Sequence, residues 1–391
     1  MTDHRLSTPR ISGLEGALTP ALVIDLDRLE QNIQTTLRLL GSQPNRWRPH
    51  IKTAKLALTL ECLLRAGVAQ FKCATTLELL TACECGAADV LVAYPCVGPR
   101  ATRVKEIGQA YPKTAISVLV ENETQGDEWR GGNISVFVDV NPGMDRTGIG
   151  QADVEAVTRL VTRIEETGVA FRGLHYYDGH HRNADLHERQ ELAYAGYRQL
   201  LRLVSSIERS GIHCAEVITS GTPGLPSAMT FPDFQRGKFV HRISAGTIVY
   251  NDVTSLAQLP AEWNYAIAAY VASMVVSQPK PDVVTCDAGH KTVSGDAGYP
   301  NCVVLGRPDL EPLHPSEEHL PLHVTDASRT PHIGDILLLA PKHVCPTVNN
   351  FDAALLVRNG KVAGTAVVTA RGREHPFPAP TTTARTAGQP A

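Results

Sequence analysis

The chain has 391 residues, with 37 lysines and arginines against 40 aspartates and glutamates, so its formal net charge is −3. This balance lacks the basic cluster that nucleic acid or an anionic membrane surface would require, so neither is expected as a partner. No apolar run approaches the ~18 residues of a membrane span, and the first residues lack the apolar segment of a secretion signal. Nine cysteines, an odd number in a long chain, indicate reduced thiols. We therefore expect a cytoplasmic enzyme.

Short apolar or β-branched segments alternate with helix-length segments through the first two thirds of the chain. Nine of them are predicted strands, at residues 21–25, 46–52, 69–74, 89–94, 115–121, 134–140, 171–177, 215–221 and 241–250. Such alternation is typical of βαβ units around a buried parallel sheet. We predict a (β/α)8 TIM-type barrel. Such a barrel needs eight strands and nine are predicted, so the first predicted strand belongs elsewhere or one of the nine assignments is wrong. A doubly wound open sheet is the alternative, but no Gly-x-Gly-x-x-Gly motif follows an early strand.

The sequence changes character near residue 255, where apolar runs become separated by Pro, Gly, Asn and Asp. Asn359-Gly360 is a strong hairpin signal between two strand-like runs, so a mostly antiparallel β-domain is expected after the barrel. The end of the chain is rich in Pro and Thr and is predicted to be disordered. The expected parts are a lead-in that is partly disordered or packed on the β-domain, the barrel, the β-domain and a disordered tail, at residues 1–18, 19–254, 255–375 and 376–391.

Lys52 stands at the end of the second predicted strand, in Arg-Pro-His-Ile-Lys. Catalytic side chains of a barrel lie where strands end and βα loops begin. An ammonium buried at a strand end is costly unless it is paired or neutral, and a desolvated lysine suits Schiff-base chemistry. The alternative is a lysine whose charged end reaches solvent. Lys55 is expected to be solvated at the start of the next helix.

Further polar residues are expected at the same end of the barrel. Ser220-Gly221-Thr222 and Gly246-Thr247 have the composition of phosphate cradles, in which small residues let backbone N–H groups approach an anion and hydroxyls add donors. Each could instead be an ordinary turn, but two such clusters on successive strands occupy the usual phosphate position of a barrel. Arg146 follows the sixth predicted strand, and Tyr177 ends the seventh.

His343 and Cys345 lie two residues apart in Pro-Lys-His-Val-Cys-Pro. On a strand end, residues i and i+2 share a face, so both could reach one ion. A histidine with a thiolate favours zinc, and two protein ligands leave room for water or substrate, as a catalytic metal requires. The alternative is a buried pair that binds no metal.

Taken together, these segments resemble one known family. The chain is similar to D-threonine aldolases and eukaryotic-type D-serine dehydratases in TPALVIDLDRLEQNI, RPHIKTAK, DRTGIG, SGTP, SAGTIVYND, CDAGHK, SEEH and PKHVCPTVNNFD, between about Thr19 and Gly372. These are fold-type III pyridoxal phosphate enzymes with an alanine-racemase-like barrel and a following β-domain. The resemblance implies a homodimeric lyase of D-3-hydroxy amino acids that uses pyridoxal 5'-phosphate and a divalent metal, zinc first, with manganese or magnesium as alternatives.

The resemblance also implies roles for single residues. Lys52 matches the lysine that links covalently to the cofactor, Arg146 the arginine at its ring, and Tyr177 the tyrosine beside it. His343 and Cys345 match the metal ligands, and with Lys52 they are the expected catalytic residues. The positions at which the family binds the phosphate correspond to Ser220, Gly221, Thr222, Gly246 and Thr247.

Two reaction outcomes remain open. The chain shares His-x-Cys with D-serine dehydratases, which release a keto acid and ammonia by β-elimination. Aldolases usually have Asp where Cys345 stands, and their base histidine aligns near Asn183, with His180 and His181 close by but out of register. We therefore favour dehydratase-like β-elimination, with aldolase-like cleavage to glycine and an aldehyde as the alternative.

Other functions share parts of this pattern. A racemase or epimerase would use the same barrel and lysine, but it needs a second base and no metal. A non-catalytic pyridoxal phosphate carrier is typically a barrel without a β-domain. A metal-stabilised binding protein would leave Lys52 unexplained.

Overall fold

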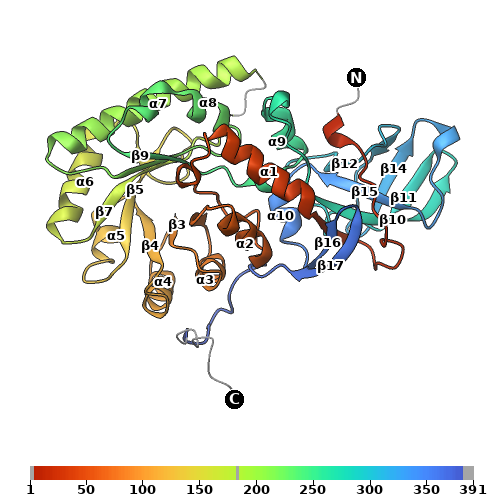
Figure 1. Cartoon of the computed structure of the whole chain (residues 1–391), viewed down its shortest axis with the longest axis horizontal. Coiled ribbons are helices and arrows are strands. Elements are labelled where there is room, and N and C mark those ends of the chain that lie inside the picture. The colour runs from red at the N-terminus through yellow and green to blue at the C-terminus, as the bar shows by residue number, and fades with distance from the viewer. Residues whose placement is uncertain (1–3, 182–184, 382–391) are drawn as a thin grey trace. The chain divides into compact units, whose positions relative to one another are not determined.

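A computed structural model describes residues 4–181 and 185–381 of the chain (Figure 1). The described residues form two compact units. The barrel unit comprises residues 40–52, 63–246 and those from 373 onward, whereas the sheet unit comprises the residues up to 39, 53–62 and 247–372.

The barrel unit is built on one parallel sheet. In pairing order, its strands are β2 (Gln70–Cys73), β3 (Asp89–Pro95), β4 (Ala115–Val120), β5 (Ser135–Asn141), β7 (Phe171–Tyr176), β8 (Glu216–Thr219) and β9 (Val240–Ile243). The short β6 (Ile149–Gly150) pairs with the end of β5. Helices lie outside this sheet (Figure 1), namely α3 (Thr76–Glu84), α4 (Pro99–Ala110), α5 (Glu123–Asp127), α6 (Val154–Glu166), α7 (Leu186–Arg209) and α8 (Leu225–Thr230). α2 (Ala57–Arg65) is divided between the two units.

Residues 47–51 close this sheet into a barrel. They pair in parallel with Ile243 of β9 on one side and with Lys72 of β2 on the other. The N–H of Lys72 donates to the Pro49 carbonyl at 3.0 Å. Because Pro49 has no N–H, the segment forms isolated bridges in place of the regular strand predicted at 46–52. This segment and the strands β2, β3, β4, β5, β7, β8 and β9 together occupy eight strand positions around the barrel. This confirms the predicted (β/α)8 barrel.

The helices of the barrel unit follow from amphipathic sequences with defined ends, as α6 illustrates. The Asp153 side chain accepts the N–H of Ala156, which satisfies one of the free donors of the first turn. Gly168 follows the helix with a φ of +75°, a conformation that glycine adopts at low cost. Between these ends, buried apolar side chains recur at helical spacing at Val157, Leu160, Val161 and Ile164.

The sheet unit holds a nine-stranded, mostly antiparallel sheet, as predicted for the residues after the barrel. Its main path is β13 (Leu310–Pro312), β14 (Leu320–Val324), β11 (Val283–Cys286), β10 (Ala269–Lys280), β1 (Ala21–Asp25), β16 (Ala353–Arg358) and β17 (Lys361–Val367). β15 (Ile336–Pro341) pairs with β10 and with β12 (Cys302–Val304). The helices of this unit are α1 (Leu26–Leu39), α9 (Val253–Gln258) and α10 (Val344–Val348). None of the helices formed by residues 4–181 and 185–381 is long and apolar enough to cross a membrane.

The first strand of the chain belongs to this sheet and not to the barrel. β1 runs antiparallel to β10 on one side and parallel to β16 on the other. Its position explains why the sequence has one strand candidate more than a barrel needs. Asn359 and Gly360 turn between β16 and β17 with φ of 51° and 68°, so the hairpin predicted from this dipeptide is confirmed.

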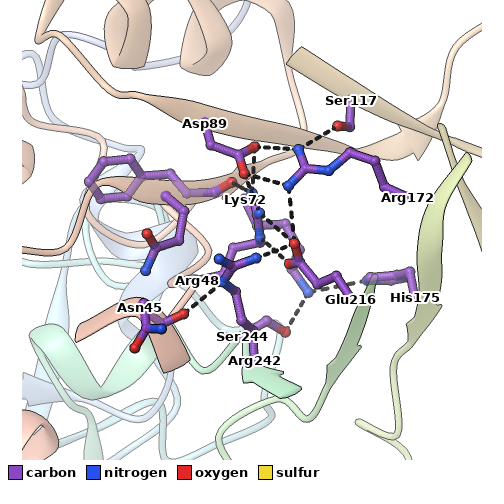
Figure 2. A network of polar contacts seen from close by, with 12 residues as sticks. Asn45, Arg48, Lys72, Asp89, Ser117, Arg172, His175, Glu216, Arg242 and Ser244 are labelled. Atoms are coloured by element: carbon purple, nitrogen blue, oxygen red, sulfur yellow. Dashed lines mark hydrogen bonds and ion pairs between the residues drawn. The ribbon is translucent and has the colours of Figure 1, made fainter. Parts of the chain in front are cut away.

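An ionic cluster joins several strands of the barrel unit (Figure 2). The fully buried Arg48 side chain donates to Asp89 at 2.6 Å and to Glu216 at 2.9 Å. Arg172 on β7 binds both of these carboxylates, and Arg242 on β9 binds Glu216. Burial alone would raise the pKa of Asp89, but the guanidinium groups of Arg48 and Arg172 hold it well below its usual range. Removing one partner would leave a buried charge without compensation, so the cluster ties these strands together.

Candidate active site

Lys52 directly follows the residues that close the barrel, at the end of the fold where catalytic groups gather. The side chain is half-buried, and the backbone N–H donates to His50 Nδ1 at 3.2 Å. Lys55 is more enclosed than Lys52, since it is only 6 % exposed and its Nζ donates to the Ala370 carbonyl. The expectation of a solvated Lys55 is therefore wrong.

A further lysine of the barrel unit is almost completely buried. Lys72 lies on β2 and is only 2 % exposed. Its Nζ donates to Ser244 Oγ at 2.6 Å and lies 3.3 Å from His175 Nε2 (Figure 2). Burial, followed by the charges of neighbouring cations, lowers the pKa of Lys72 to about 7. Lys72 was not among the site residues predicted from the sequence, although a lysine inside a short apolar strand is the signal that could have identified it.

His175 and Asp139 extend this polar group across the barrel interior. His175 Nδ1 lies 2.7 Å from Asp139 Oδ1, and Thr147 donates to the other oxygen of the same carboxylate at 2.7 Å. Burial lowers the pKa of His175, and the nearby Lys72 lowers it further. Burial alone would raise the pKa of Asp139, but the contact with His175 holds it below its usual range. The pair is thus a carboxylate and a neutral imidazole.

Arg146 and Tyr177 lie together in the barrel unit. The Arg146 guanidinium is 4.8 Å from the centre of the Tyr177 ring, and Lys72 Nζ is 5.4 Å from the same centre. Arg146 is exposed, whereas Tyr177 is half-buried. Because an aromatic face attracts cations, these contacts help to fix the ring near both side chains.

Ser220, Gly221 and Thr222 follow β8 as a tight loop. Ser220 has a φ of +61°, which is uncommon for a residue with a side chain. Within the described part of the chain, the hydroxyls of Ser220 and Thr222 are buried without a hydrogen-bond partner. Buried hydroxyls are normally paired, so two free ones fit a ligand rich in acceptor oxygens, such as a phosphate. A Cβ at Gly221 would lie 2.9 Å from the Tyr177 ring, so glycine lets this loop lie against it.

Gly246 marks a second close approach of the backbone. A Cβ at this position would lie 2.1 Å from the His50 carbonyl oxygen, too close for any residue but glycine. The strand predicted at 241–250 is also shorter, because β9 ends at Ile243. Thr247 begins a 3-10 turn in the sheet unit.

His343 and Cys345 lie in the sheet unit, but they do not end a strand as predicted. His343 is the N-cap of α10, and Cys345 lies in the first turn of this five-residue helix. Pro346 is the third helical residue, where its missing N–H would have no partner inside the helix anyway. The predicted placement of the two residues on one face of a strand end is therefore wrong, although their side chains do contact each other.

The surroundings of His343 and Cys345 fit a metal ion. His343 Nδ1 lies 2.6 Å from Asp296 Oδ2, a carboxylate–histidine contact that typically orients an imidazole whose other nitrogen binds metal. Cys345 Sγ lies 2.9 Å from Thr53 Oγ1. Burial alone would lower the pKa of His343, but contacts with Cys345 and Asp296 raise it to about 9. The described residues contain no group of three or more His, Cys, Asp or Glu placed to hold a metal.

The segment after β7 contains the other histidines considered above. The rings of His180 and His181 are 3.9 Å apart, and both residues are half-buried. Asn183, which aligns near the base histidine of aldolases, lies outside the described residues.

The closed barrel carries Lys52 directly after residues 47–51, and a loop with free hydroxyls follows β8. These features are typical of the class of alanine-racemase-like pyridoxal phosphate enzymes. The family model described as "Alanine racemase, N-terminal domain" matches residues 24–252. A second, described as "Putative serine dehydratase domain", matches residues 268–357.

Individual relatives make the assignment narrower. The chain is 31 % identical over 373 residues to a D-threonine aldolase from Arthrobacter sp., covering 90 % of this chain and 93 % of that protein. It is 25 % identical to the D-threo-3-hydroxyaspartate dehydratase of Delftia sp. (strain HT23), covering 86 % of this chain and 93 % of that protein. The structure of a D-threonine aldolase from Filomicrobium marinum superposes with a TM-score of 0.84 at 27 % identity, over 93 % of this chain and 98 % of that one. The chain belongs to the family of D-threonine aldolases and D-serine dehydratases, which are pyridoxal-phosphate-dependent lyases.

Proposed function

We propose that this protein is a pyridoxal-phosphate- and divalent-metal-dependent lyase that dehydrates a D-3-hydroxy amino acid to a keto acid and ammonia. The relatives named above are enzymes of D-threonine or of D-threo-3-hydroxyaspartate, which supports this class of substrate. The observation that carries the elimination outcome is the contact between His343 and Cys345. A thiolate and an imidazole form a soft donor pair that favours zinc, and a Lewis acid helps hydroxide to leave the β-carbon.

The proposed cofactor site lies among the described residues of the barrel unit. Lys52 would bind the cofactor covalently and, when substrate replaces it, take the proton from the α-carbon. Ser220 and Thr222 would donate their free hydroxyls to the phosphate, where Gly221 leaves the backbone accessible. Pyridoxal phosphate itself supplies a ring that withdraws the negative charge developing at the α-carbon.

Other predicted residues have supporting roles in the proposal. Arg146 and Tyr177 would bound the cofactor ring, while Gly246 would complete the phosphate site. His343 and Cys345 would hold the metal, with zinc favoured over manganese or magnesium by the thiol.

Aldol cleavage to glycine and an aldehyde is the second candidate. It is favoured by the 31 % identity to a D-threonine aldolase over most of both chains. This outcome requires a base that removes the proton of the β-hydroxyl, and His180 and His181 are the described histidines nearest to the aligned position.

We also propose a homodimer in the cytoplasm. All nine cysteines are free thiols in the structure, which supports a reducing compartment. Size-exclusion chromatography with light scattering would give the mass of the protein in solution, where 42.2 kDa corresponds to one chain. A species of one chain's mass at all concentrations would refute the dimer.

The deciding assay uses purified protein with D-serine, D-threonine and D-3-hydroxyaspartate, before and after treatment with EDTA. A keto acid with ammonia selects dehydration, and glycine with an aldehyde selects aldol cleavage. Lys52→Ala should abolish the visible absorbance of the cofactor, whereas Lys105→Ala, on the outer helix α4, should retain it. Activity that survives both EDTA and Cys345→Ala, with Cys85→Ala as the matched thiol control, would remove the metal from the proposal.

A further inference from the structure

The hydrogen bonds around Lys72 determine what its amine can still do. The Ser244 hydroxyl donates to the Ser220 carbonyl at 2.7 Å, so its oxygen accepts an N–H of Lys72. His175 directs Nδ1 to the Asp139 carboxylate, so in the neutral ring the acceptor nitrogen is Nε2, which faces Lys72. These bonds use two N–H groups of Lys72. The remaining position on Nζ is a lone pair when the amine is neutral and a third N–H when it is charged.

The same bonds connect Lys72 to the proposed cofactor residues. Ser244 links its amine to the backbone of Ser220, the first residue of the loop with free hydroxyls. Lys72 Nζ is also 5.4 Å from the centre of the Tyr177 ring, which Arg146 contacts as well. Lys72 is thus connected to the phosphate loop by two successive hydrogen bonds through Ser244.

The charge of Lys72 depends on several groups of the barrel unit. Burial is the largest effect and lowers its pKa to about 7, and the cations Lys52 and Arg146 act in the same direction. Asp139 and Asp178 raise the pKa in part, and His175 is neutral. An anion bound nearby favours the ammonium, so binding the phosphate of a cofactor would be coupled to proton uptake.

We propose that Lys72 is a second lysine of the cofactor site, a non-covalent positioning residue whose gain or loss of a proton changes the charge next to the cofactor. This inference rests on the proposed cofactor site at Lys52. As an ammonium, Lys72 strengthens the attraction for the anionic cofactor and the electron withdrawal by its ring. As a neutral amine, Lys72 gives less electrostatic stabilisation to the negative charge on the cofactor.

Absorbance titration of the protein loaded with pyridoxal phosphate tests the inference. The visible spectrum of the wild type should change with pH in a one-proton transition near or above neutrality, and Lys72→Met should lose that transition. Lys55→Met is the matched control, because it also removes a buried lysine but lies in the sheet unit. It should titrate like the wild type. A transition in Lys72→Met with the wild-type midpoint would overturn the inference.

Ser244→Ala supplies a test that keeps the lysine. The Ser244 oxygen stabilises the ammonium form of Lys72 more than the neutral amine. Its loss should therefore move the transition to lower pH. An unmoved midpoint in a folded Ser244→Ala protein would also contradict the inference, even if Lys72→Met does not fold.

The titration also separates this inference from the proposed function. If wild-type protein acquires no visible band, or if Lys52→Ala keeps it, the proposed cofactor site is wrong. If the band depends on Lys52 and Lys72→Met titrates as the wild type does, only the role of Lys72 is refuted.

Discussion

Asp296 Oδ2 and His343 Nδ1 are 2.6 Å apart, and this contact leaves the Nε2 atom of the imidazole as the one available to a metal. Asp296→Ala should therefore weaken divalent-metal binding by about 10- to 100-fold, because the histidine loses the partner that orients it. Competition of the metal-free protein with a chromogenic zinc chelator would measure the change. Asp335→Ala, which removes another carboxylate beside a histidine, is the matched control. Equal affinity in both variants would contradict a metal on His343.

The free hydroxyls of the phosphate loop lead to a second prediction. Ser220→Ala and Thr222→Ala should each lower the affinity of the cofactor-free protein for pyridoxal phosphate by about 10- to 100-fold, since a hydrogen bond to a charged group contributes about 1.5–3 kcal/mol. Quenching of intrinsic fluorescence would report the binding. Ser205→Ala on α7, an exposed hydroxyl bonded within its own helix, should bind as the wild type does. Two single variants with unchanged affinity would show that these hydroxyls do not hold the phosphate.

A third prediction concerns the backbone at Gly246. Gly246→Ala places a methyl group 2.1 Å from the His50 carbonyl oxygen, so the barrel-closing segment or the residues after β9 must shift. We expect a loss of about 1–3 kcal/mol in the free energy of unfolding. Chemical denaturation would measure it, with Gly150→Ala as the control, because a Cβ there meets nothing within 4 Å. Equal stability of the two variants would be inconsistent with this close approach.

The ionic cluster predicts a specific dependence of stability on pH. The pKa of Asp89 is lower in the folded protein than its ordinary value of 3.8, so its contribution is present above about pH 4 and is lost as the pH falls through the folded pKa. Asp89→Asn should cost about 3–5 kcal/mol at neutral pH, because it leaves buried guanidinium charge without its partner.

Urea denaturation between pH 3 and pH 7 would measure both effects of Asp89. The stability difference between wild type and Asp89→Asn should shrink below pH 4. Asp233→Asn, which removes the carboxylate of an exposed ion pair with Arg236, should change stability by less than about 1 kcal/mol throughout. A difference for Asp89→Asn that stays constant as the solution is acidified would exclude the assigned pKa shift.

Local patterns were sufficient for the barrel, because each strand–helix unit carries its own periodicity and caps. They also predicted the Asn359-Gly360 hairpin, whose conformation depends on two adjacent residues. They did not assign the first strand to a sheet, since β1 pairs with residues more than 200 positions away along the chain. The residues of a strand do not by themselves indicate which distant strand it pairs with.

The site shows the same division between local and distant information. Lys52 and the phosphate loop stand at strand ends, where a parallel barrel places its functional groups. Lys72 was missed because its partners His175 and Ser244 are 103 and 172 residues away, and only they make a lysine tolerable inside β2. The helix α10 was missed because five residues are too few to display a helical period.

The central position of β1 has a consequence for synthesis of the chain. This strand is made more than 300 residues before one of its neighbours in the sheet, β16, which begins only at Ala353. Until that part is translated, β1 has N–H and C=O groups without their final partners, and an unpaired strand can bind the edge of another chain. A nascent or truncated chain that stops before residue 353 therefore keeps an exposed strand edge, and protection of that edge by chaperones would favour correct folding.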